Sequence, residues 1–226
     1  MSADPAARLD AAAREKLETV LALLAEEQAS VSSVVDERAW QVHVVDSLTG
    51  LEVDDLGSAR RVGDIGAGAG FPGLVLAVAL PGTQIDLIES IGRKCEFMRH
   101  AIEAAAIPNA TVLNTRSEDH AGGEGREAYD AVTARAVGRL STLAELASPL
   151  LKPNGVLVAW KGKRDPEEEA QLANAAATLA MGSEQILDVG NRAGSQHRHL
   201  HVIRKTGPTP AGLPRKPGIA KKRPKG

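Results

Sequence analysis

The chain has 226 residues, of which 43% are hydrophobic, 25% charged and only 2% aromatic, a composition typical of globular domains and not of fibrous or disordered chains. A single cysteine, Cys95, excludes an internal disulfide and fits a reducing compartment. The longest apolar stretch, residues 74–80, is too short to span a bilayer. Residues 1–16 lack an apolar targeting segment, so we expect a soluble cytoplasmic protein with no membrane partner.

The net charge of −2 conceals an asymmetry along the chain. Residues 204–226 hold eight of the 27 basic residues and no acid, which leaves 19 basic against 29 acidic residues in 1–203. A basic tail on an acidic body indicates a polyanionic partner such as RNA. A tail that only improves solubility is the alternative.

The pattern of apolar residues predicts helices at the N-terminus and then alternating strands and helices. The predicted N-terminal helices span residues 6–28 and 34–50. The predicted strands are 61–65, 84–89, 110–114, 129–134, 155–161, 184–190 and 197–204. The predicted helices among them are 71–80, 92–106, 139–151 and 166–180. This alternation predicts an α/β fold with a mostly parallel sheet, and the short connection 191–196 predicts that the last two strands form an antiparallel hairpin.

Three regions follow from this pattern. A helical extension covers residues 1–58, an α/β domain covers 59–205, and a basic tail rich in proline and glycine covers 206–226. Because of its composition, we expect the tail to be extended and disordered when alone, and to add no element to the core. We also expect it to lie away from the ligand pocket, so that its removal leaves cofactor binding unchanged.

The stretch GDIGAGAGFPG, residues 63–73, follows the first predicted strand and opens a helix. Glycines at 66, 68, 70 and 73 permit a sharp turn and let a ligand approach the backbone closely. Glu89 closes the next strand, where a carboxylate can bind both hydroxyls of a ribose. Together these features predict a cofactor that contains a nucleoside.

Two further residues indicate which class of nucleoside-containing cofactor is bound. Phe71 stands where a dinucleotide-binding fingerprint has its third glycine. Asp64 precedes the glycines, and D-I-G-A-G-A-G resembles the first motif of S-adenosylmethionine-dependent methyltransferases. That resemblance implies a seven-stranded Rossmann-like sheet and S-adenosyl-L-methionine as cofactor. The alternatives are another nucleic-acid or small-molecule methyltransferase on this fold, a nicotinamide-dependent oxidoreductase, and a non-catalytic RNA-binding protein.

Several stretches resemble one bacterial family, RsmG, also called GidB. They are RAWQVHVVDSL (38–48), GAGAGFPG (66–73), RAVG (135–138), WKG (160–162), RHLHVIRK (198–205) and PRKPGIAKKRP (214–224). The resemblance implies methylation of guanine N7 in 16S ribosomal RNA, at the guanine of position 527 of that RNA. It also implies a monomer whose partner is 16S ribosomal RNA or the assembling small ribosomal subunit.

The same resemblance assigns cofactor contacts to individual residues of this chain. Ser117 departs from the small apolar residue common at its position, so we expect it to act through its backbone. The family's contacts fall on Gly66, Phe71, Ser117, Glu118 and Arg135, and the glycine motif adds Asp64, Gly68 and Glu89 to the predicted cofactor-binding set.

Methylation at guanine N7 needs no general base, because N7 carries an in-plane lone pair at neutral pH. Catalysis then depends on positioning the reactants. Cations near guanine O6 or a phosphate would hold the base in register, and we select Arg135, Lys161 and Arg198 for this role.

Five further residues carry less specific signals. His197, His199 and His201 alternate along the last predicted strand and so share one face, but no cysteine or acid joins them and we expect no metal site. His43 and Asp46 share a face of the second helix. They either cap the cofactor pocket or tie this helix to the α/β domain.

Overall fold

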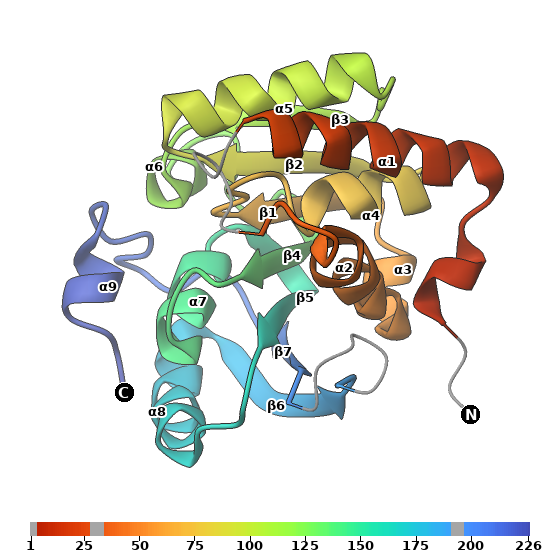
Figure 1. Ribbon diagram of the computed structural model, residues 1–226. Coiled ribbons are helices and arrows are strands. Elements are labelled where there is room, and N and C mark those ends of the chain that lie inside the picture. Colours follow the sequence, from red (N-terminus) through yellow and green to blue (C-terminus); the bar gives the residue numbers. More distant parts are fainter. Residues whose placement is uncertain (1–3, 28–33, 191–196) are drawn as a thin grey trace.

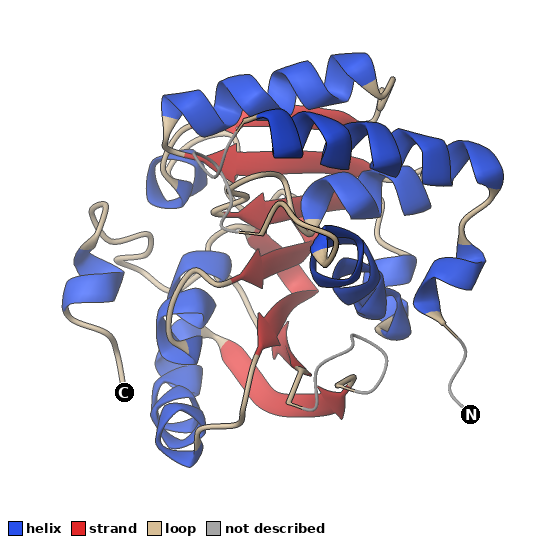
Figure 2. Cartoon of the chain, viewed as in Figure 1, coloured by secondary structure: helices blue, strands red, loops and turns tan. Residues whose placement is uncertain are grey.

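The computed structural model describes residues 4–27, 34–190 and 197–226. Residue 28 of the first predicted helix and the connection 191–196 lie outside this part. The strands are β1 (Arg61–Ile65), β2 (Gln84–Glu89), β3 (Ala110–Asn114), β4 (Tyr129–Arg135), β5 (Leu151–Lys161), β6 (Met181–Asp188) and β7 (His199–Lys205). They form one sheet that carries helices on both faces (Figures 1 and 2).

The strand order of the sheet is β3-β2-β1-β4-β5-β7-β6. Strands β1 to β5 pair in parallel, as the alternation of strands and helices predicts. The predicted antiparallel pairing of the last two strands is confirmed. Strand β7 lies between β5 and β6 and is antiparallel to both, so the chain end returns into the sheet and does not extend its edge.

Short helical segments replace the second predicted helix. The N-terminal elements are η1 (Pro5–Arg8), α1 (Ala11–Glu26), η2 (Trp40–Val45), α2 (Asp46–Leu48), η3 (Thr49–Glu52) and α3 (Asp54–Gly57). η2 is a π-helix, and η3 is a 3-10 helix. Hydroxyls of Ser47 and Thr49 donate to the carbonyls of His43 and Asp46, and such side-chain bonds compete with regular α-helical bonding.

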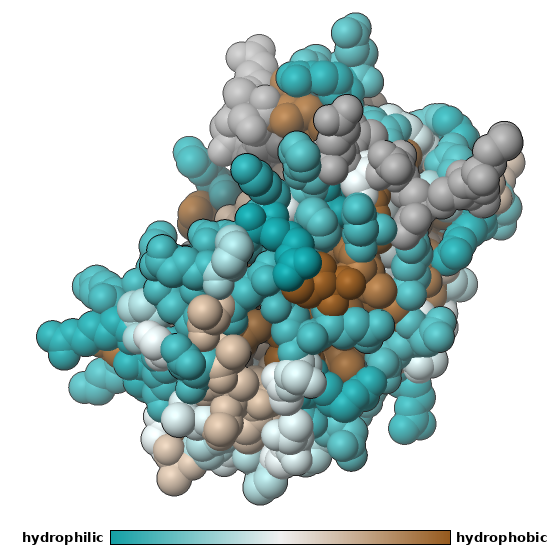
Figure 3. Space-filling view, turned by 90° about the horizontal axis from the view of Figure 1, so that it is seen from below, coloured by the Kyte–Doolittle hydropathy of each residue, from teal (hydrophilic) through white to brown (hydrophobic). Residues whose placement is uncertain are grey.

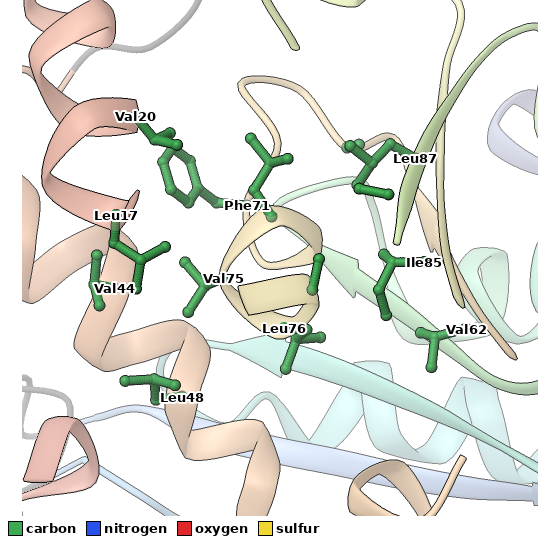
Figure 4. Close-up of a cluster of buried hydrophobic side chains, with 14 of the residues drawn as sticks. Leu17, Val20, Val44, Leu48, Val62, Phe71, Val75, Leu76, Ile85 and Leu87 are labelled. Carbon is green, nitrogen blue, oxygen red and sulfur yellow. The ribbon is translucent and has the colours of Figure 1, made fainter. Parts of the chain in front are cut away.

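Two apolar clusters fill the two faces of the sheet. The remaining helices are α4 (Gly73–Ala79), α5 (Gly92–Ala104), α6 (Ser117–Ala121), α7 (Leu140–Ala147), α8 (Pro166–Ala176), η4 (Ala177–Leu179) and α9 (Ile219–Lys222). One cluster joins α1, α2, α4 and α5 to the sheet, and the other joins α7 and α8 to it. Figure 4 shows Leu17 and Val20 of α1 in the same core as Val75 of α4, so the N-terminal extension shares the core of the α/β domain.

The basic tail is packed against the domain, which contradicts the expectation that it adds nothing to the core. Helix α9 lies beside α7 (Figure 1), and Leu213 and Ala220 are only 5% and 2% exposed. Arg215 pairs with Glu145 of α7, which is itself buried. The tail is rich in proline and glycine, and this composition led to the wrong expectation. Two isolated apolar residues and one ion pair are enough to hold a short segment against an existing surface.

Lys205 fixes the point where the tail leaves the sheet. Its ammonium is fully buried and donates to Glu127 Oε1 at 2.8 Å, Leu151 O at 2.7 Å and Thr209 Oγ1 at 2.7 Å. Three acceptors match the three donors of a lysine, which compensates the cost of burying its charge. The pKa of Glu127 falls to about 2, chiefly because it accepts the hydrogen bond from Lys205.

The outer surface gives no sign of a membrane segment in the described ranges. No helix there is long and apolar enough to cross a bilayer. The face seen in Figure 3 is mostly hydrophilic, with hydrophobic residues showing through over a limited area.

Candidate active site

The glycine loop between β1 and α4 adopts a backbone that favours glycine. Gly66 and Gly68 have φ of +62° and Gly70 has φ of +92°, in the left-handed region that side chains disfavour. A Cβ on Gly66 would lie 2.9 Å from Cγ2 of Val137. The loop therefore presents bare backbone, as the sequence predicts.

Asp64 lies beneath this loop and does not line the cavity described below. Its Oδ1 accepts the hydroxyl of Thr133 at 2.8 Å, and its Oδ2 accepts the N–H of Gly73 at 3.0 Å. Complete burial raises the pKa of Asp64 to about 7, against the opposing effect of these two hydrogen bonds. The side chain thus holds the end of the glycine loop onto β4, and any effect on a cofactor is indirect.

Glu89, at the end of β2, organises the other side of the loop. Its carboxylate accepts the N–H of Gly68 at 3.1 Å and that of Ile91 at 2.9 Å. The residue also lines the cavity. A carboxylate has about four acceptor positions, so two backbone bonds leave capacity for the hydroxyls of a ribose.

A cavity of about 180 Å³ lies at the carboxyl ends of β1 and β2. Four predicted cofactor residues, Gly66, Glu89, Ser117 and Glu118, contribute to its wall. Its apolar walls come from Ile65, Ile88, Val137 and Leu146, among others. Four of the predicted residues therefore lie together around one cavity.

The cavity wall also contains residues that the sequence analysis missed. Gly218, Ala220 and Lys221 come from the basic tail, so the expectation that the tail lies away from the pocket was wrong. A segment of four helical residues is too short to produce a recognisable periodic pattern. The resemblance of residues 214–224 to a family motif was the available signal.

Ser117 and Glu118 follow β3 and begin α6. The hydroxyl of Ser117 donates to Glu118 Oε2 at 3.1 Å, and Glu118 Oε1 accepts the N–H of Gly218 at 2.8 Å. Glu118 therefore connects the cavity wall to the tail.

Phe71 is held in the core and not in the wall of the cavity. Its ring stacks on that of His43, with 4.4 Å between centroids and 14° between planes. In Figure 4 it lies next to Val20 of α1. The family resemblance predicts that Phe71 contacts the cofactor. In the structure its ring joins the glycine loop to the N-terminal segment.

Arg135, the last residue of β4, contacts the N-terminal segment. It donates to Val42 O at 2.8 Å, to Asp46 Oδ2 at 3.0 Å and to His43 Nδ1 at 3.2 Å. Since His43 Nε2 lies 2.9 Å from Val34 O, these partners fit a neutral imidazole that carries its proton on Nε2. Burial lowers the pKa of His43, which also favours the neutral form.

The three basic residues predicted to position the guanine form ion pairs with two acids. Arg135 and Arg198 both form ion pairs with Asp46. The contact of Arg198 Nε with Asp46 Oδ1, at 2.7 Å, lacks hydrogen-bond geometry. Lys161 lies at the end of β5 and donates instead to Glu168 Oε1 at 2.7 Å and to Gly138 O at 3.1 Å. The backbone carbonyl of Asp46 accepts a hydrogen bond from the indole N–H of Trp160 at 2.8 Å. These contacts support the interpretation that His43 and Asp46 tie the N-terminal segment to the sheet.

The histidines of β7 have separate partners. His199 Nδ1 lies 3.0 Å from Gly162 O, and His201 Nδ1 lies 2.5 Å from Glu184 Oε1. Within the described ranges no group of three His, Cys, Asp or Glu side chains is arranged to hold a metal ion.

Solved structures of other proteins share this fold. A SAM-dependent O-methyltransferase from Thermotoga maritima has a TM-score of 0.59 at 12% identity, covering 83% of this chain and 71% of the other. An O-methyltransferase from Bacillus cereus in complex with SAH has a TM-score of 0.58 at 19% identity, covering 87% and 92%. The fold is therefore that of the SAM-dependent methyltransferases.

The sequence itself matches a more specific family. Residues 15–200 match the family described as GidB, rRNA small subunit methyltransferase G. Ribosomal RNA small subunit methyltransferase G of Rubrobacter xylanophilus is 41% identical over 187 residues, which is 80% of this chain and 71% of that protein. The chain belongs to the GidB family, and the family resemblance found in the sequence motifs is confirmed.

Proposed function

We propose that this protein is an enzyme that transfers a methyl group from S-adenosyl-L-methionine to N7 of a guanine in 16S ribosomal RNA. Membership of the rRNA small subunit methyltransferase G family carries this proposal. The family motifs imply guanine 527 of that RNA as the target. Partners are naked 16S RNA or the assembling small subunit, and the protein works as a cytoplasmic monomer.

The residues of the cavity fit S-adenosyl-L-methionine. The left-handed backbone of Gly66 gives a cradle that a Cβ would fill, and Glu89 retains acceptor positions for a ribose. Ser117 and Glu118 line the same cavity, on the side reached from β3. When bound, the cofactor supplies a methyl group on a positively charged sulfonium. Asp64, Gly68 and Phe71 support the site by holding the glycine loop.

The protein's part in the reaction is to position the two reactants. Guanine N7 attacks with a lone pair that needs no deprotonation, so we assign no general base. Arg135 lies beside Phe71 of the glycine loop, and Asp46 partly neutralises both Arg135 and Arg198. Arg198 is 24% exposed at its side chain and Lys161 is 21% exposed, which leaves both accessible for a phosphate or for guanine O6.

The direct test is a comparison of 16S RNA from cells with and without the gene for this protein. Fragments of the RNA are compared by mass spectrometry, and the proposal predicts that one fragment containing a methylated guanine loses 14 mass units, the mass of a CH₂ group, when the gene is deleted. Restoring the gene restores the methylated fragment. An unchanged set of fragments from 16S RNA would refute the proposed substrate.

A further inference from the structure

The C-terminal strap, which we define as residues 212–222, crosses the cavity wall. Gly218, Ala220 and Lys221 of the strap line the same cavity as Gly66 and Glu89. The strap comes from the far end of the chain, so the cavity is completed only when this segment is in place.

The strap is anchored to the domain ahead of Gly218. Leu213 is buried, and its carbonyl accepts a hydrogen bond from Arg126 Nη1 at 3.0 Å. Both nitrogens of the Arg215 fork reach the carboxylate of Glu145, which is 3% exposed. A planar bidentate pair of this kind fixes orientation as well as distance.

Two contacts join the strap to residues that themselves line the cavity. The N–H of Gly218 donates to Glu118 Oε1 at 2.8 Å, and the hydroxyl of Thr142 donates to Ala220 O at 3.4 Å. Gly218 has φ of +79°, so its N–H points at Glu118 from a backbone conformation that favours glycine. The strap position and the cavity shape are therefore linked through Glu118 and Thr142.

We infer that the strap is a wall of the nucleoside half of the cofactor site, and that Gly218, Ala220 and Lys221 contact the adenosine moiety. The cavity joins Glu89, suited to a ribose, with the apolar side chains of Ile88 and Leu146, suited to a planar base. Ala220 belongs to this same wall and is 2% exposed. The inference rests on the proposed function in one respect, that the ligand is S-adenosyl-L-methionine.

Matched substitutions within the strap test the inference by calorimetry with S-adenosylhomocysteine, which binds without reacting. Gly218 and Gly212 both have positive φ, +79° and +85°, and a Cβ on either would meet nothing within 4 Å. Gly218→Ala and Gly212→Ala thus introduce similar backbone strain, but only residue 218 lines the cavity. We expect Gly218→Ala to weaken binding roughly tenfold and Gly212→Ala to leave it unchanged.

A second pair compares two neighbouring exposed lysines. Lys221 lines the cavity and Lys222 is not among its lining residues, yet alanine removes the same charge at each. Lys221→Ala should weaken binding about fivefold, and Lys222→Ala should not. Melting temperatures of all four variants serve as a control for folding.

Limited proteolysis gives a readout that needs no variant. Trypsin can cleave after Lys221 and Lys222, whereas proline follows Lys216 and Arg223 and blocks cleavage there. Intact-mass spectrometry follows cleavage of the wild-type strap. Bound S-adenosylhomocysteine should slow this cleavage severalfold. Equal affinities within both variant pairs and unchanged cleavage would overturn the inference while leaving the proposed function intact. Failure of the wild-type protein to bind the compound at all would overturn both.

Discussion

The carboxylate of Asp46 lies 3.0 Å from the guanidinium of Arg135, and the two side chains are only 2% and 12% exposed. The pair joins the N-terminal segment to the carboxyl end of β4, and Arg198 approaches the other oxygen of Asp46 at 2.7 Å. One buried acid therefore pairs with two arginines, of which Arg135 also lies over the ring of Phe71 in the glycine loop.

Removal of this acid should destabilise the protein strongly. Asp46→Ala leaves Arg135 buried without its counter-charge, and breaking a buried pair in this way costs about 3–5 kcal/mol. Urea unfolding measures the change. The control is Asp55→Ala, which breaks the exposed pair with Arg204 and should hardly move the unfolding midpoint. Similar effects of the two substitutions would contradict the structural role given to Asp46.

Asp64 should make the stability depend on pH in a defined window. Its pKa is raised to about 7 from 3.8, so the folded protein keeps a proton that the unfolded chain releases. Stability from this group is complete below pH 4 and is lost as the pH rises through 7, by up to about 4 kcal/mol.

Asp64→Asn removes this titration and keeps both contacts, since its amide oxygen can accept from Gly73 and its amide nitrogen can donate to Thr133. Unfolding free energies of the two proteins between pH 4 and 8 provide the measurement. We expect the variant to gain stability relative to the wild type as the pH rises. Parallel curves would show that Asp64 titrates normally in the folded protein.

Gly68 tests the glycine loop. Its φ of +62° disfavours a branched side chain, although a Cβ would make only an ordinary contact, with Gly66 O at 3.8 Å. Gly68→Val should shift the loop away from Glu89, which accepts the Gly68 N–H, and should weaken binding of S-adenosylhomocysteine at least about tenfold.

The control is Gly82→Val, where a Cβ meets nothing within 4 Å and φ is not positive. This variant should bind the compound as the wild type does. If Gly68→Val also binds normally, the loop does not hold the cofactor.

The exposed cations of the tail should set the salt dependence of RNA binding. Lys216, Lys222 and Arg223 are exposed and are not among the residues that line the cavity. Each phosphate contact with single-stranded RNA contributes about −0.7 to the slope of log affinity against log salt concentration. Replacement of all three by Gln should flatten the slope by about two units, with affinity for S-adenosylhomocysteine unchanged. Identical slopes would assign the tail cations to solubility alone.

The sequence predicts most of the sheet because buried strands leave a local signal. The bounds of β1, β2 and β3 agree with the predicted ranges 61–65, 84–89 and 110–114. Strand β5 begins at Leu151, earlier than the predicted residue 155, because Pro153 and Asn154 interrupt the apolar pattern. The second predicted helix forms π, α and 3-10 segments, and two of its carbonyls, those of Val42 and Asp46, accept bonds from residues far away in the chain.

The candidate site is predictable where it follows a motif and not where it depends on tertiary packing. The glycine loop, Glu89, Ser117 and Glu118 were predicted and lie together around the cavity. Phe71 and Asp64 were also predicted to bind the cofactor, but their side chains face the core. There they hold the glycine loop through contacts with His43 and Gly73. The contribution of Gly218 to the cavity depends on a contact across a separation of 100 residues, which no local pattern encodes.

Chemical cleavage of the RNA identifies the atom that is methylated. Unmodified 16S RNA, free or in small subunits, is incubated with the purified protein and S-adenosyl-L-methionine, then treated with borohydride and aniline, which cut RNA at 7-methylguanosine. We expect one new cut, at guanine 527, that requires both protein and cofactor. Methyl incorporation without a cut, or no incorporation into either form of the RNA, would contradict it.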